Sequence, residues 1–141
     1  MIAYVDASVL LRIALRQPDA LPEWRQVEQG VASALVVTES LRTLDRLRLR
    51  VKLPDAEVAS RRAKILELIA SLELVEVDAV VLDRAAQPMP TLLGTLDALH
   101  LATAILWREQ FRADLTMATH DSALGLAARA HGMPVVGVAP A

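Results

Sequence analysis

The sequence contains no cysteine, few aromatic residues and no long apolar segment. Without cysteine the chain can form neither a disulfide nor a thiolate-bound metal site, which suits the reducing cytoplasm where we expect this protein. Because only 3% of the residues are aromatic, a core must be built from leucine, valine, isoleucine and alanine. No apolar run reaches about 18 residues, and no secretion signal is present. These absences predict a protein that neither spans a membrane nor is exported.

The chain nevertheless has enough apolar material for one folded domain. Its 141 residues are 54% hydrophobic, and that length suits a single core. No internal repeat, low-complexity segment or linker divides the sequence. We therefore predict one domain over residues 1–141.

The charge is unevenly distributed along the chain. The net charge is −2, but residues 42–64 hold eight basic and three acidic side chains, so that this segment carries +5 and the rest −7. A basic patch beside an acidic remainder can steer a polyanion towards a site. Alternatively, these side chains form solvated helix faces with ordinary ion pairs. The charges alone leave both interpretations open.

Short apolar segments alternate with helical patterns. We predict strands at 2–5, 34–37, 73–77, 114–118 and 135–138, the third of them at an edge of the sheet because its residues alternate in polarity. We predict helices at 7–15, 79–87, 95–107 and 122–131, a helical hairpin at about 39–71 capped by Thr38, and a short helix or connector at 24–30 that ends on glycine. Strands that alternate with helices predict an α/β fold around a parallel sheet.

Four acids occupy positions where predicted strands end or helices begin. Asp6 and Asp121 follow predicted strands, Glu39 lies in a first helical turn, and Asp97 opens a helix that is apolar nearly all round. The binding crevice of such sheets lies beyond the carboxyl ends of the strands. Four carboxylates there would repel one another, and a hard cation such as Mg²⁺ or Mn²⁺ relieves the repulsion. We predict that the three aspartates ligate the ion, and that Glu39 ligates it or orients the attacking water.

The polar residues near these acids indicate a reaction. The hydroxyls of Ser8 and Thr119 are placed to hold a carboxylate or a metal-bound water. Arg42 lies one turn after Glu39, where it would pair with the glutamate or clamp a phosphate, and Arg46 continues the stripe. An acidic metal site beside an arginine stripe predicts hydrolysis of a phosphodiester by metal-activated water.

Other interpretations compete with this one. Each acid has a structural alternative as a helix cap or a first-turn dipole residue, with Thr95 as the cap beside Asp97. His100 shares the face of Asp97, and a packed, hydrogen-bonded core histidine explains it better than a metal ligand does. Aspartyl-phosphate phosphatases also place an aspartate after the first strand, but they use Asp-x-Asp where this chain has Ser8. A non-catalytic RNA-binding or repressor module would fit the basic patch.

The motifs together resemble a known family. Residues 4–10 (YVDASVL), 96–104 (LDALHLATA) and 119–121 (THD), with Glu39 between them, are similar to a PIN-domain ribonuclease, and more narrowly to a VapC-type toxin of a bacterial type II toxin–antitoxin pair. The resemblance covers essentially the whole chain, and the block around Asp97 is its most specific part. It implies a PIN-like three-layer α/β/α sandwich with a parallel sheet of strand order 3-2-1-4-5.

The same resemblance implies a function. It implies Mg²⁺- or Mn²⁺-dependent endonucleolytic cleavage of single-stranded or looped RNA, with a homodimer and a VapB-like antitoxin that blocks the site. Carried over residue by residue, it makes a catalytic quartet of four acids with two hydroxyl companions. The quartet is Asp6, Glu39, Asp97 and Asp121, and the companions are Ser8 and Thr119.

Overall fold

A computed structural model describes residues 1–140 of the chain, which form an α/β fold around a five-stranded sheet. Every strand pairs in parallel, in the order β3-β2-β1-β4-β5, which confirms the predicted sheet and its strand order. The strands are β1 (Ile2–Val5), β2 (Gln29–Ser33), β3 (Leu72–Val75), β4 (Thr116–Ala118) and β5 (Val135–Val136).

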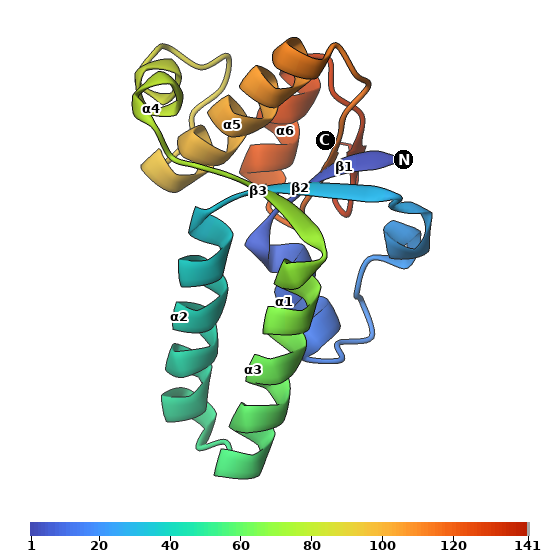
Figure 1. Cartoon of the computed structure of the whole chain (residues 1–141), viewed down its shortest axis with the longest axis vertical. Coiled ribbons are helices and arrows are strands. Elements are labelled where there is room, and N and C mark those ends of the chain that lie inside the picture. Colours follow the sequence, from blue (N-terminus) through green and yellow to red (C-terminus); the bar gives the residue numbers. More distant parts are fainter. Residues whose placement is uncertain (141) are drawn as a thin grey trace.

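Helices cover both faces of the sheet and make the three layers visible in Figure 1. One face carries α1 (Ala7–Ala14), α2 (Leu35–Val51) and α3 (Asp55–Ala70). The other carries α4 (Ala79–Ala85), α5 (Thr95–Phe111) and α6 (Ser122–Ala130). A short 3-10 helix, η1 (Pro22–Gln26), precedes β2. Within residues 1–140 no helix combines the length and apolar character that crossing a membrane would need.

Strand β1 lies at the centre of the sheet and contributes to two hydrophobic cores. Val5 packs with Leu10 and Ile65 under the α1–α3 layer, whereas Tyr4 packs with Leu101 and Met117 under the α4–α6 layer. Successive residues of a strand point to opposite faces, so a strand covered on both sides must be apolar throughout. This requirement explains the continuous Ile-Ala-Tyr-Val run that ends at Asp6.

The predicted second strand at 34–37 was wrong. That run forms the first turn of α2, and β2 instead spans Gln29–Ser33, part of which we had predicted as a helix or connector. A short apolar run does not distinguish a buried strand from a buried helical turn. Gly30 misled the prediction because it lies inside β2, where a Cβ atom would collide with the Leu72 side chain of β3. Here the glycine permits close strand packing and does not end a helix.

This error moves the start of α2 but not the position of Glu39. Ala34, and not Thr38, is the N-cap, so Glu39 lies in the second helical turn. Only one residue separates β2 from α2, and the helix therefore begins directly at the carboxyl edge of the sheet. Glu39 faces that edge as predicted.

The remaining bounds differ from the predictions by a few residues. The strands β3, β4 and β5 are shorter than predicted, and β3 is the edge strand that its alternation indicated. Helix α5 continues to Phe111, and the helical hairpin begins at Leu35 and turns at Lys52, which adopts a left-handed conformation. Asp78 caps α4 by accepting a hydrogen bond from the Val81 amide at 2.9 Å.

Candidate metal centre at the carboxyl edge of the sheet

Asp6 is the first residue beyond the central strand. Its amide donates to the Ala118 carbonyl at 3.0 Å, which continues the β1–β4 ladder and places the side chain at the carboxyl edge of the sheet. Although the backbone of Asp6 occupies the N-cap position of α1, its carboxylate makes no capping hydrogen bond. Instead, Oδ2 accepts hydrogen bonds from the hydroxyls of Ser8 and Thr119, each at 2.8 Å. The structure therefore disfavours the helix-cap interpretation of this residue.

The two hydroxyls belong to a continuous network that fixes this carboxylate. Ser8 Oγ accepts from the His120 amide, and Thr119 Oγ1 accepts from the Asp121 amide, both at 3.0 Å. Each hydroxyl thus uses its proton on Asp6 and its lone pairs on the loop after β4. Both bind the same oxygen, so Oδ1 keeps its lone pairs for a ligand. The predicted carboxylate-holding geometry of Ser8 and Thr119 is present.

Asp121 combines a structural contact with a place at the site. Its Oδ1 accepts from the Leu124 amide at 2.9 Å, so this residue is the N-cap of α6. A capping carboxylate uses one oxygen on the helix and can present the other to a cation. The cap interpretation is therefore correct for Asp121 and compatible with ligation.

Glu39 reaches the site from the opposite helical layer and is held by a buried histidine. His100 Nε2 lies 2.5 Å from Glu39 Oε1, and His100 Nδ1 lies 2.6 Å from the Tyr4 hydroxyl. The imidazole is 1% exposed and the Glu39 side chain 22% exposed. One ligand-type atom from each of Asp6, Glu39 and His100 lies within 4.8 Å of the others. The predicted role of His100 as a hydrogen-bonded core residue agrees with this geometry.

Asp97 faces the same acids from the first turn of α5. Gly94, and not Thr95, is the N-cap of this helix, and no capping bond involves a side chain. Burial, together with the charges of Asp121, Asp6 and Glu39, raises the pKa of Asp97 from 3.8 to about 6 against the lowering effect of His100. These charge effects place Asp97 in the neighbourhood of the other three acids. Within residues 1–140, the group whose ligand atoms all lie within 4.8 Å of one another consists of Asp6, Glu39 and His100.

Burial and nearby charges determine the protonation of Tyr4 and His100, the two buried groups next to these acids. Burial raises the pKa of the Tyr4 hydroxyl well above its ordinary value, so that Tyr4 stays protonated. Burial by itself lowers the pKa of His100, but the hydrogen bond and charge of Glu39, with the charges of Asp6 and Asp97, together outweigh it and raise the pKa. A cluster with this excess of negative charge and these oxygen donors fits a hard divalent cation.

The arginines behave differently from the acids. Arg42 pairs with Asp45 at 3.5 Å and not with Glu39, and its side chain is 64% exposed. Arg46 donates to the Thr43 hydroxyl at 3.2 Å. A groove of about 550 Å³ begins at Ser8 and runs between α1 and α2, with Arg46 and Arg50 along its wall. Of the two predicted substrate arginines, Arg46 therefore shares a groove with Ser8, whose hydroxyl binds Asp6.

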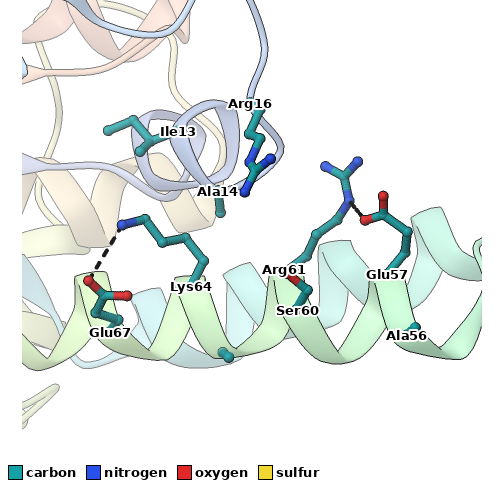
Figure 2. A pocket seen from close by; sticks show the side chains of 10 residues that line it. Ile13, Ala14, Arg16, Ala56, Glu57, Ser60, Arg61, Lys64 and Glu67 are labelled. Atoms are coloured by element: carbon teal, nitrogen blue, oxygen red, sulfur yellow. Dashed lines mark hydrogen bonds and ion pairs between the residues drawn. The ribbon is translucent and has the colours of Figure 1, made fainter.

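A larger hollow lies away from the acids. It occupies about 750 Å³ between α1 and α3, where Glu57 pairs with Arg61 at 3.1 Å and Lys64 with Glu67 at 3.5 Å (Figure 2). None of the four acids lines it. Cavity size alone would therefore indicate the wrong place for the metal centre. The chemistry of the side chains locates it.

Sequence reasoning missed one residue of the site. Tyr4 is the only tyrosine of the chain, and it appeared in the sequence only as part of an apolar strand. Its position two residues before Asp6 was the available signal, because alternate residues of a strand share a face. Only the fold shows that its hydroxyl meets His100 from α5.

Comparison with known proteins agrees with this fold. The family model of the PIN domain matches residues 3–135 of the chain, close to its full length. The chain therefore belongs to the PIN domain family, as its motifs predicted. Membership also removes the aspartyl-phosphate phosphatase interpretation, which required a second aspartate in place of Ser8.

Individual relatives narrow the comparison to one branch. Ribonuclease VapC46 of Mycobacterium tuberculosis is 38% identical over 137 residues, which cover 94% of this chain and 95% of that protein. The VapC20 toxin of M. tuberculosis, described as cleaving the sarcin–ricin loop, superposes with a TM-score of 0.63 at 17% identity, over 99% of this chain and 100% of that one. VapBC2 from Rickettsia felis, bound to a promoter DNA fragment, superposes with a TM-score of 0.65 at 13% identity, over 96% of this chain and 97% of that one. At these two lower identities the likeness concerns the fold.

Proposed function

We propose that this protein is an endoribonuclease that depends on Mg²⁺ or Mn²⁺ and acts as the toxin of a type II toxin–antitoxin pair. The observation that carries the proposal is the convergence of four acids at one edge of the sheet, with the pKa of Asp97 raised to about 6. Carboxylates so arranged repel one another and destabilise the fold unless a bound cation neutralises their charge. The 38% identity to a ribonuclease supports RNA as the substrate.

In this proposal each acid has a distinct task. Asp6, fixed by two hydroxyls, and Asp97 and Asp121 hold the cation. Glu39, held by His100, completes the site and orients the water that attacks the phosphodiester. When bound, a divalent cation would make that water more acidic and would stabilise the charge that develops on the phosphate.

The groove between α1 and α2 is the proposed path of the RNA. It connects Ser8 at the site with Arg46 and Arg50, whose charges would neutralise backbone phosphates. Arg42 is exposed on the same helix and would contribute to steering more than to binding. Such contacts are independent of sequence, so they would position the strand without selecting it.

The proposed partners follow the relatives. Solved structures with this fold include toxin–antitoxin complexes, which supports a VapB-like antitoxin for this chain. We also propose that the chain is a single PIN domain over residues 1–141, that it forms a homodimer, and that it acts in the cytoplasm. Size-exclusion chromatography with light scattering would measure the oligomeric state.

The test is cleavage of RNA by purified, metal-stripped protein. End-labelled single-stranded and hairpin RNAs should be cut internally after addition of Mg²⁺ or Mn²⁺, and Asp6→Asn or Asp97→Asn should lower the rate by roughly 1,000-fold. Thermal melts of both variants would separate lost activity from lost folding. RNA binding without turnover, unaffected by these substitutions, would contradict the proposal and favour a non-catalytic binding module.

A further inference from the structure

A buried chain of hydrogen bonds links the centre of the sheet to Glu39. The Ser33 amide in β2 donates to the Tyr4 hydroxyl in β1 at 3.2 Å. That hydroxyl lies 2.6 Å from His100 Nδ1 in α5, and His100 Nε2 lies 2.5 Å from Glu39 in α2. Tyr4, Ser33 and His100 are all fully buried. The chain joins residues of two strands and of helices from both layers.

The direction of two of these hydrogen bonds follows from which groups can donate. A backbone amide can only donate, so the Tyr4 oxygen accepts from Ser33. An ionised carboxylate can only accept, so His100 Nε2 carries a proton and donates it to Glu39 Oε1. The tautomer that would turn a lone pair of Nε2 towards Glu39 is therefore excluded. On the other side of the ring, the Tyr4 hydroxyl lies 2.6 Å from Nδ1 and braces the imidazole.

The same contacts argue against His100 as a metal ligand. A ligating nitrogen must be unprotonated and directed at the ion. Here Nδ1 is occupied by Tyr4 and Nε2 by Glu39, and the ring is 1% exposed. His100 lies within 4.8 Å of the other two candidate ligands because it supports one of them.

We propose that His100, braced by Tyr4, is a positioning residue that holds the Glu39 carboxylate for the cation. Its Nε2–H donates to Oε1 and leaves Oε2 for the site. This inference rests on the proposed function only in taking the four acids as a cation site. Partners of this kind restrict the rotation of a ligand, and their loss typically lowers metal affinity or activity about 10- to 100-fold.

The first experiment measures Mn²⁺ affinity by calorimetry or electron paramagnetic resonance, without RNA. His100→Leu removes both nitrogens and should weaken Mn²⁺ binding about 10- to 100-fold. His100→Gln returns an N–H donor towards Glu39 and should recover most of the affinity. Ser40→Ala is the matched control, because Ser40 is buried beside Glu39 in the chain and its hydroxyl has no partner within residues 1–140. That control should bind as the wild type does.

The second experiment observes the tautomer directly. In protein labelled with ¹⁵N-histidine, His100 should show a proton on Nε2, and this signal should persist when Mg²⁺ is added. Tyr4→Phe removes the hydroxyl that braces Nδ1, so Mn²⁺ affinity should fall while Nε2 stays protonated. This variant and His100→Gln keep the test decisive if His100→Leu fails to fold in a thermal melt.

Three results would overturn the inference. They are an unprotonated Nε2 in the wild type, a Nε2–H signal that disappears on binding Mg²⁺ as a ligand would require, and Mn²⁺ affinity that is the same in a folded His100→Leu variant or no better with His100→Gln. None of these measurements uses RNA. A protein that shows the expected tautomer and affinities but cuts no RNA would contradict the proposed function and leave this inference intact.

Discussion

The two halves of helix α2 hold their charged side chains in opposite ways. At the amino-terminal end Glu39 is bound by His100, which lies 61 residues further along the chain. Towards the other end Asp45 pairs with Arg42 at 3.5 Å and with Arg48 at 2.8 Å, all within the same helix. The first contact depends on the whole fold, whereas the second requires only the helix.

This difference shows where the protein needs geometry and where it needs only charge. A buried polar group that loses its partner costs about 1–3 kcal/mol, so the contact at Glu39 fixes one arrangement. Exposed ion pairs contribute about 0–1 kcal/mol and exchange readily with solvent. The exposed arginines can therefore release their partners and meet a phosphate at little cost.

Among the changes that test this comparison, the largest effect is expected from matched substitutions in the two halves of α2. Glu39→Gln should lower the rate of RNA cleavage at least about 100-fold, because it removes a charge from the metal centre. Asp45→Asn makes a comparable change in an exposed group and should leave the rate within about twofold. Single-turnover assays at saturating Mg²⁺ would measure both rates. Similar losses in the two variants would break the comparison.

A smaller effect is expected for the arginines along the groove. Arg46→Ala with Arg50→Ala should raise KM for RNA about 10-fold at low salt and leave kcat nearly unchanged, because these side chains would bind phosphates away from the reaction. The dependence of affinity on salt should weaken by about 0.7 in log–log slope for each phosphate that is no longer neutralised. Arg25→Ala, which removes one positive charge from η1 and away from the groove, is the control for each arginine changed singly. A fall in kcat alone would place these arginines in the chemistry.

The smallest effect concerns stability without metal. The pKa of Asp97 rises from 3.8 in the unfolded chain to about 6 in the fold, which corresponds to about 3 kcal/mol; screening of a half-buried group reduces this to about 1 kcal/mol. The folded protein holds this proton more tightly, so stability falls as pH rises from about 4 to 6 and then levels.

Asp97→Asn should therefore raise the free energy of unfolding by about 1 kcal/mol at about pH 8, and the gain should vanish near pH 4. Urea unfolding at both pH values in a chelator would measure it. Asp45→Asn should instead lower stability by less than about 0.5 kcal/mol, because it loses exposed ion pairs. Mg²⁺ should then stabilise the wild type more than Asp97→Asn. If Asp97→Asn did not raise the free energy of unfolding, repulsion between the carboxylates would not destabilise the metal-free protein.

The sequence located the four acids even where it misplaced a strand. Glu39 was predicted beside the sheet through an incorrect strand at 34–37, and it lies there because only one residue separates β2 from α2. Gly30 was interpreted as the end of a helix, because the side chain that packs closely against it, that of Leu72, is distant in the sequence. Local patterns identify which residues are apolar, but the choice between a short strand and a helical turn depends on tertiary packing.

By itself the sequence determined the family, the parallel α/β fold and the acids that face one another, because strand alternation and the position of Asp6, Asp97 and Asp121 at element ends follow from local order. Only the tertiary structure decided which oxygen of Asp6 the hydroxyls hold, that Arg42 pairs with Asp45, and that the Tyr4 hydroxyl meets the ring of His100. The reason is that packing between the layers determines which side chains meet when they are far apart in the chain. The spacing of residues in the sequence does not encode those contacts.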